Sequence, residues 1–245
     1  MKRAVAAIVA GLTLIAHAQG NAFTSGSQAE TPSSIQSQER PDKNGHHATW
    51  NLAEDIRTTG NQVGFNQGAG GVWYFMTSAG VAHNPLIYRF IRHFNAPALA
   101  FGSGITIPEG FSCWQEADVL PDVCFNFTDH PVTLESFDVP PQTVDMHPTP
   151  DRFSIVAWKS PLTGIVGIRG SFTDLDPNCG NGILWSIDKN ARTLLSGDLP
   201  NGASERFSPR VRVEQDDVLY FIVDAKNSDF CGDSTSLDVT IHQRQ

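Results

Sequence analysis

The sequence predicts an all-β protein, a two-sheet antiparallel sandwich of the jelly-roll type. Short runs rich in β-branched and aromatic residues recur from residue 71 onward, separated by Gly, Pro, Asn and Asp. Few stretches show helical periodicity, and the internal repeats that a β-propeller requires are missing. Many short strands joined by long, irregular connections are typical of a two-sheet sandwich.

The clearest strand candidates are GVWYFMTS, LIYRFIRHF, SIVAWKS, IVGIRGSF, GILWSID, RVRVE, DVLYFIVDA and SLDVTI. In SLDVTI the alternation places Leu237, Val239 and Ile241 on one face of the strand. In GILWSID, Trp185 shares a face with two isoleucines, which predicts a position in the core. DVLYFIVDA is apolar on both faces, which predicts a central strand.

The connections between these runs carry turn residues. Ser160, Pro161 and Gly164 divide SIVAWKS from IVGIRGSF, and we expect a hairpin there. A tight hairpin turn is also expected at residues 215–217, between RVRVE and DVLYFIVDA. A short helix is predicted within residues 51–59, where LAEDI has mild helical spacing.

Three segments are predicted along the chain. Residues 1–18 read as a secretory signal peptide, with Lys2 and Arg3, an apolar run, and the small-x-small site at Ala16 to Ala18. The apolar run is shorter than the roughly 20 residues that span a bilayer, so we expect a secreted protein, extracellular or periplasmic, without membrane insertion. Residues 19–47 are polar and predict a flexible leader. Residues 48–245 form the single β-sandwich domain.

The charge narrows the classes of partner. Lys and Arg number 17 against 26 Asp and Glu, a net charge of −9. Such a surface repels phosphate backbones, which argues against nucleic acid as a partner. It also opposes binding of polyanionic sugars, unless a local basic patch overrides the net charge. The sequence does not indicate an oligomeric state.

Two disulfides are expected from the four cysteines. An exported chain meets an oxidising compartment, and no Cys-x-x-Cys pair suggests zinc. Three pairings are possible, of which we favour Cys113–Cys124, closing a short loop, and Cys179–Cys231, joining two Gly/Asp/Asn-rich loops.

A sugar site needs an exposed aromatic ring beside polar side chains, since the ring stacks on the apolar face of a pyranose. We expect Trp114, in a loop held by a disulfide, to be such a ring. Trp73 and Tyr74 lie on opposite faces of a strand, so one of the two should point outward. Trp158 and Trp185 are predicted to be core residues.

A structural calcium ion is the one cofactor that the sequence suggests. Asp174, Asp176 and Asn178 alternate in a loop, as oxygen ligands of a hard cation do. Asp229 and Asp233 join them if Cys179–Cys231 forms. The alternative is an Asx-rich turn without metal.

No catalytic residue is predicted. The chain has no Gly-x-Ser-x-Gly motif and no His-Glu-x-x-His motif, and its acidic residues lie mostly in turns. His147, in the His-Pro pair before SIVAWKS, is interpreted as the entry to a strand.

The order of the motifs resembles a module that recurs in secreted and cell-surface bacterial proteins. The elements that carry the resemblance are WNLAED, GGVWYF, MHP, IVAWKSP, GIVGIRGSF, GNGILWSI, QDDVLYFIVD and DSTSLDVTI. Such modules are similar to galactose-binding jelly rolls and carbohydrate-binding modules. The resemblance implies a non-catalytic module for an extracellular glycan or another surface ligand. A structural or adhesive envelope protein and an extracellular polysaccharide-active enzyme are the alternatives.

Overall fold

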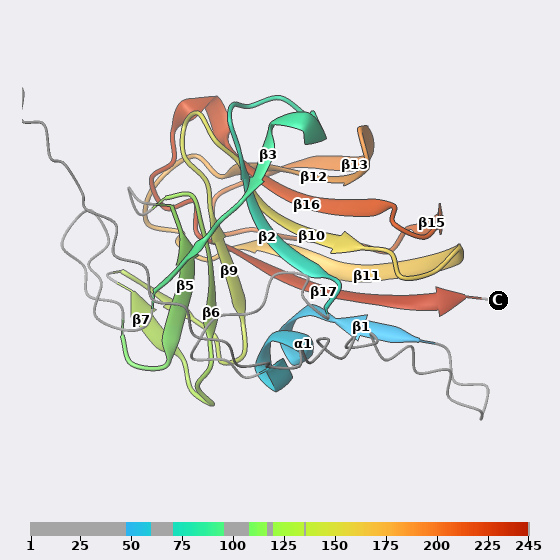
Figure 1. Cartoon of the computed structure of the whole chain (residues 1–245). Helices are drawn as coiled ribbons and strands as arrows, with labels where there is room; N and C mark the ends of the chain where they lie inside the picture. The colour runs from blue at the N-terminus through green and yellow to red at the C-terminus, as the bar shows by residue number, and fades with distance from the viewer. Residues whose placement is uncertain (1–47, 60–70, 96–107, 117–119, 135, 245) are drawn as a thin grey trace, which may run out of the picture. The chain divides into compact units, whose positions relative to one another are not determined.

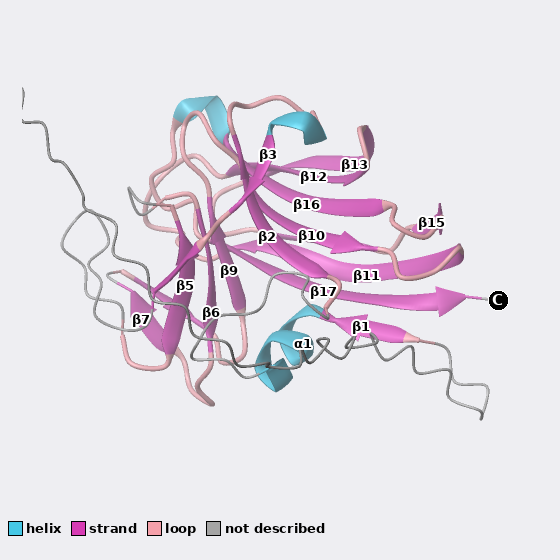
Figure 2. Ribbon diagram, viewed as in Figure 1, coloured by secondary structure: helices cyan, strands magenta, loops and turns pink. Residues whose placement is uncertain are grey.

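The structure, a computed structural model, describes residues 48–59, 71–95, 108–116, 120–134 and 136–244. The predicted signal peptide and leader lie outside the described residues. Strands dominate the chain, and helical structure is confined to α1 (Leu52–Thr59) and two short 3₁₀ turns, η1 (Pro85–Ile87) and η2 (Lys226–Ser228), in the described part (Figure 2). None of the described helices is long and apolar enough to cross a membrane.

The strands are β1 (Thr49–Asn51), β2 (Trp73–Ser78), β3 (Tyr88–Phe90), β4 (His93–Asn95), β5 (Phe111–Gln115), β6 (Asp122–Asn126), β7 (Val132–Leu134), β8 (Phe137–Val139), β9 (Val144–His147), β10 (Ser154–Lys159), β11 (Gly164–Asp174), β12 (Ile183–Lys189), β13 (Arg192–Leu199), β14 (Ser204–Phe207), β15 (Arg210–Val213), β16 (Val218–Ala225) and β17 (Thr235–Arg244).

These strands form two large antiparallel sheets, so the all-β sandwich prediction is confirmed. The nine-stranded sheet runs β14-β11-β17-β9-β6-β5-β4, with β1 added beside β17 and β15 beside β11 (Figure 1). The six-stranded sheet runs β13-β12-β16-β10-β2-β3. Strand β16 lies between β12 and β10, as its doubly apolar sequence predicts. A separate small hairpin joins β7 to β8.

One large apolar cluster holds the two sheets together. The inward residues of β17, Leu237, Val239 and Ile241, are buried, as the alternation predicts. Trp158 and Trp185 belong to the same cluster, at 0% and 4% exposure, which confirms both as core residues. Because inward and outward residues alternate, each sheet also has an outer face whose side chains do not take part in this core.

Both predicted hairpins are wrong. Strand β10 pairs with β2 and β16, whereas β11 pairs with β14, β15 and β17, so residues 160–163 cross between the sheets. The turn at residues 215–217 makes the same crossing, from β15 to β16. Turn residues mark a reversal of the chain, but local sequence does not reveal which strand becomes the neighbour.

The predicted short helix is present as α1. Asn51 begins it, since its Oδ1 accepts a hydrogen bond of 2.8 Å from the Glu54 amide. Leu52 and Ile56 are buried on one side of the helix and join the main core.

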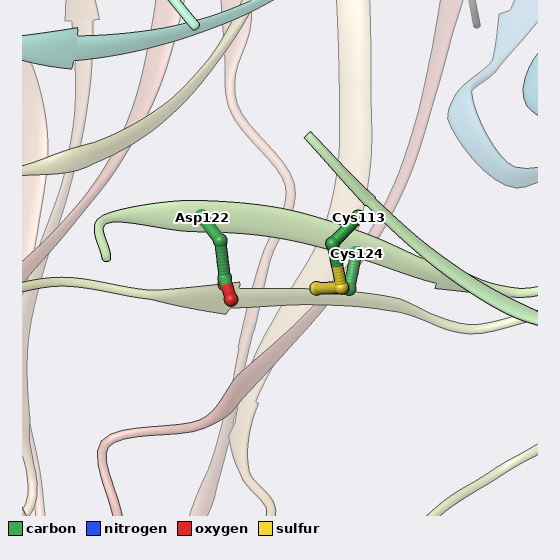
Figure 3. Close-up of side chains that lie close together, drawn as sticks. All are labelled: Cys113, Asp122 and Cys124. Carbon is green, nitrogen blue, oxygen red and sulfur yellow. A yellow bond between two sulfur atoms is a disulfide. The ribbon is translucent and has the colours of Figure 1, made fainter. Parts of the chain in front are cut away.

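Both favoured disulfides are confirmed. Cys113–Cys124 joins β5 to β6 at opposite positions of the ladder, in the interior (Figure 3). Cys179–Cys231 joins the loop after β11 to the loop before β17. The second bridge therefore fixes two loops at the same end of the β11–β17 pair.

Candidate functional site

Trp114 does not form a sugar platform. The prediction that it lies on a loop is wrong, because Trp114 lies in β5 and is 2% exposed. Its ring packs against Phe75 at 4.5 Å and Phe94 at 4.8 Å between centroids. The disulfide expected to hold it in a loop instead joins two paired strands, which directs the neighbouring ring into the core.

Trp73 and Tyr74 point to opposite faces of β2, as the alternation along a strand predicts. Trp73 points inward, is 1% exposed, and donates from Nε1 to Asp55 Oδ2 at 2.8 Å. Tyr74 has the outward position on β2 and is half-buried. Of the three predicted aromatic ligand residues, Tyr74 alone reaches an outer sheet face.

Tyr74 is part of an aromatic pair on the six-stranded sheet. Its ring stacks on Phe90 of β3, with centroids 5.5 Å apart and planes inclined by 22°. Phe90 is 42% exposed, which is high for an aromatic ring on a sheet. Lys159 lies near Tyr74 and is held by Asp216 at 2.7 Å. A partly exposed aromatic pair is thus bordered by a cation and a carboxylate.

The loop between β2 and β3 folds over the same outer face. His83 Nδ1 lies 2.7 Å from Asp188 Oδ2 on β12, and the His83 ring packs on Phe153 at 5.3 Å. Where this loop ends, the ring of Tyr88 packs edge to face on the ring of Tyr220, with centroids 5.1 Å apart. The His83–Asp188 contact therefore anchors residues 79–87 across several strands.

A pair of buried carboxylates lies where β11 ends and β17 begins. Asp174 is the last residue of β11 and Asp233 lies two residues before β17; they are 3% and 0% exposed. Neither oxygen of Asp233 has a hydrogen-bond partner among the described residues, whereas the Asp174 carboxylate lies by the backbone amides of Gly202 and Asp176. Oδ1 of Asp233 and the Cys231 carbonyl oxygen both lie against Gly180, which has φ +86° and no side chain to exclude them.

Burial and mutual repulsion raise the pKa values of these groups. Loss of solvent raises the pKa of Asp233 to about 8, and the neighbouring charge of Asp174 adds to the effect. The same desolvation raises the pKa of Asp174 to about 6, against nearby backbone amides that lower it. An unpaired buried carboxylate is costly, so this arrangement is suited to a cation between the two groups.

Asp176 and Asn178, the other predicted metal ligands, have protein partners. Asp176 accepts from the Asn178 amide at 3.1 Å and from Ser136 Oγ at 3.2 Å. The Asn178 side chain donates to the Ser136 carbonyl and to Asp176. The structure thus places this pair in an Asx turn and brings Asp174 together with Asp233.

One further group has the spacing of a metal site. Side-chain atoms of Cys113, Asp122 and Cys124 lie within 4.8 Å of one another, the sole such set of three in the searched, described residues (Figure 3). The two sulfurs are joined in a disulfide and cannot act as thiolates. This cluster is therefore not a metal centre.

His147 ends β9 and is half-buried. Its Nδ1 donates to the Pro148 carbonyl at 2.9 Å, and its ring approaches Phe230 edge-on at 6.2 Å. Desolvation lowers the pKa of His147. These contacts are with backbone and an apolar ring, but the interpretation of His147 as the entry to the next strand is wrong, because His147 is the last residue of β9 and β10 begins only at Ser154.

The nine-stranded sheet carries a hollow on its outer face. A groove of about 1040 Å³ lies over β17, β11, β14 and β1, and the charged side chains that line it are Arg169, Arg206, Asp238, His242 and Arg244. Thr49, Ser171 and Thr240 add hydroxyl groups. Burial, with Arg244 and Arg169 nearby, lowers the pKa of His242.

Sequence reasoning missed two features of these surfaces. Phe90 was included in a strand run, but its pairing with Tyr74 depends on the register of β2 and β3, which places Met76 opposite Phe90. The arginines of the groove come from β11, β14 and β17, which are far apart in sequence. The RVRVE pattern and the alternating arginine of IVGIRGSF were the available signs of a charged outer face.

Comparisons with known proteins give matches among solved structures alone. No family model and no curated protein matches the chain. Among solved structures, the chain is similar to a family 51 carbohydrate-binding module of Clostridium perfringens in complex with methyl-galactose, at 8% identity and TM-score 0.38, covering 80% of this chain and 100% of that one. A family 29 module complexed with mannohexaose matches at 10% identity and TM-score 0.32, over 61% and 90% of the two chains.

An adhesin domain of the Lys-gingipain of Porphyromonas gingivalis also matches, at 14% identity and TM-score 0.30, over 41% of this chain and 74% of that one. With TM-scores of this size the likeness carries no argument of its own. The two sheets themselves define the class of protein as an all-β sandwich.

Proposed function

We propose that this chain is a secreted, non-catalytic module that binds an extracellular carbohydrate through the outer face of the six-stranded sheet. The observation that carries the proposal is the stacked Tyr74–Phe90 pair, which offers a broad aromatic surface beside Lys159 and Asp216. The apolar C–H face of a sugar ring packs on such a surface, and its hydroxyl groups bond to the flanking charged side chains.

The stiffness of the surface favours binding. Tyr74 and Phe90 lie on paired strands and pack on each other, so their rings lose little freedom when a ligand binds. The two disulfides support a site of action outside the cytosol, because such bridges persist in oxidising compartments.

Affinity electrophoresis on neutral plant, bacterial and animal polysaccharides tests the proposal. We expect the wild-type chain to be retarded by at least one of them, and Tyr74→Ala or Phe90→Ala to weaken that binding about tenfold, a loss of about 1.4 kcal/mol. Phe230→Ala is the matched control, since Phe230 is 40% exposed and lies apart from the pair in sequence and in its ring contacts. Absence of binding across the panel, or an equal loss in Phe230→Ala, contradicts the proposal.

We also propose that Asp174 and Asp233 hold a structural calcium ion. Two buried carboxylates, of which Asp233 accepts no hydrogen bond from described residues, lie beside a backbone carbonyl and provide the hard oxygen ligands that Ca²⁺ prefers. The Cys179–Cys231 bridge fixes the loops that carry them. The ion then stabilises the end of the sandwich, and the sugar site lies on the other sheet.

A further inference from the structure

The groove on the nine-stranded sheet is lined by three arginines and lies on the other sheet from the aromatic pair. Arg206 lies opposite Ser171, and Arg169 lies two residues before Ser171 on the same face of β11. Arg244 lies opposite Ile165, further along the same face. Since a strand rises about 3.3 Å per residue, the arginines are distributed over about 20 Å of the sheet.

These arginines lack acidic partners among the described residues. Elsewhere Arg57, Arg89 and Arg152 each lie beside a carboxylate. Within the described part of the chain, neither Arg169 nor Arg206 makes an ion pair, and none of the bridges involves Arg244. Arg192, Arg210 and Arg212 are also without ion pairs to described residues, so the groove is distinguished by the clustering of its arginines on a chain of net charge −9 rather than by their lack of partners.

Gly167 lets two of the groove side chains, His242 and Arg244, lie close to the sheet. Gly167 leaves room for the side chains of β17 to lie on the sheet, because an added Cβ would stand 2.6 Å from His242 Nε2 and 2.8 Å from Arg244 Nε. That Nε is buried and has no hydrogen-bond partner in the described chain. Arg244 as a whole is half-buried and lines the groove, so an anionic group there reaches the exposed part of its side chain rather than Nε.

We propose that this groove binds an acidic polysaccharide through its carboxylate or sulfate groups. Arginine forks match the planar geometry of carboxylates and also bond sulfate oxygens, and the interleaved Thr240 and Ser171 hydroxyls suit sugar hydroxyls. The length of the row fits several successive sugars better than one small anion. Phe207, the one Phe, Tyr or Trp among the described residues lining the groove, is 6% exposed and offers no platform for bases, and net charge −9 opposes a phosphate backbone. Both features favour a polysaccharide over a nucleic acid.

Titration calorimetry with defined polymers tests this proposal. The probes are polygalacturonate for carboxylates, dextran sulfate for sulfates, unmodified dextran, and single-stranded DNA. We expect the wild-type chain to bind at least one acidic polysaccharide at low salt, with affinity that falls as salt rises. Comparison of polygalacturonate with dextran sulfate shows which anion the groove prefers.

The double variant Arg169→Gln/Arg206→Gln should bind the acidic polymer at least tenfold more weakly. Arg192→Gln is the matched control: Arg192 is exposed on β13 of the other sheet, so its loss should change affinity less than twofold. Unchanged melting curves confirm that the variants are folded. Failure of the wild-type chain to bind either acidic polymer, an equal loss in the control, or equally tight binding of DNA overturns the proposal.

The outcome is independent of the proposed neutral-sugar site. Tyr74→Ala should leave binding of the acidic polymer unchanged, because Tyr74 lies on the outer face of the opposite sheet. A loss of acidic-polymer binding in Tyr74→Ala would show that the two surfaces form one site and would contradict a separate groove.

Discussion

Asp233→Asn separates a calcium site from an acidic turn. In wild-type protein the Asp233 carboxylate is fully buried and accepts no hydrogen bond from described residues. Without a cation, its pKa of about 8 means that the group takes up a proton when the chain folds at pH 7, which costs stability. Replacing it by a neutral amide of the same size removes this cost and should stabilise the chain by up to about 4 kcal/mol at pH 7. With calcium bound, the same substitution removes a ligand and should destabilise. The sign of the effect therefore depends on the metal.

The size of the calcium effect follows from mass action. At 100 times the dissociation constant, a ligand that binds only the folded state adds about 2.7 kcal/mol. For a domain of this size, 1 kcal/mol shifts the melting temperature by about 2–4 °C, so calcium should raise it by about 5–11 °C. Asp233→Asn should lose almost all of that gain.

Differential scanning calorimetry in EDTA and in millimolar CaCl₂ measures how Asp233→Asn changes the melting temperature without and with the metal. Asp238→Asn is the control, since Asp238 is an exposed acid on the adjoining strand β17 and should show the wild-type shift. If the wild-type melting temperature is the same in EDTA and in calcium, or if Asp233→Asn keeps the whole shift, the carboxylate pair is not a calcium site.

Three other properties can be predicted from the same contacts. Trp158→Ala removes a fully buried ring and should lower the free energy of unfolding by about 3–5 kcal/mol in urea titrations, whereas a cost below 1 kcal/mol would contradict its core position. Burial raises the pKa of Asp145 to about 7 and that of Asp122 well above its usual value, so the stability these groups contribute is fully present below about pH 4 and is lost as pH rises through 7. In EDTA, the Asp145 contribution to the unfolding free energy should fall by about 4 kcal/mol from pH 4 to 8, so the total fall should be smaller by about that amount in Asp145→Asn. His83→Ala removes the contact with Asp188 and should increase amide exchange in residues 79–87 without changing exchange in β11; unchanged exchange in that loop would show that the contact does not anchor it.

Local patterns predicted the parts of the fold that depend on local order. Alternation identified the inward residues of β17, and the apolar GILWSID run placed Trp185 in the core. Both disulfides were predicted from the oxidising compartment expected of an exported chain and from the loops around the cysteines. Strands β5, β6 and β9, which pair side by side, were not predicted. Their sequences FSCWQ, DVCFN and VDMH are short, and their buried polar residues hide the apolar pattern by which a strand is recognised.

The candidate sites depended on long-range pairing, and there the predictions were weaker. Trp114 was assigned to a loop because its cysteine neighbour suggested a braced turn, but the bridge links opposite residues of one ladder. Asp174 was found from spacing within its own loop, whereas its partner Asp233 comes from a segment 59 residues further along the chain. The disulfide hypothesis was the one clue that joined these two loops.

Because side chains alternate along a strand, the residues that pack in the core and the residues that face solvent are separate sets. Inward residues of β11 and β17 must pack against β10, β12 and β16, which fixes them as apolar. Outward residues at 169, 206 and 244 carry no such constraint, and a long charged side chain there costs the core nothing. If those arginines served solubility alone, paired or scattered acids on this acidic chain would do the same with less mutual repulsion. Their unpaired clustering over one groove is instead the arrangement that an external anion would neutralise, and the arginine variants test that distinction directly.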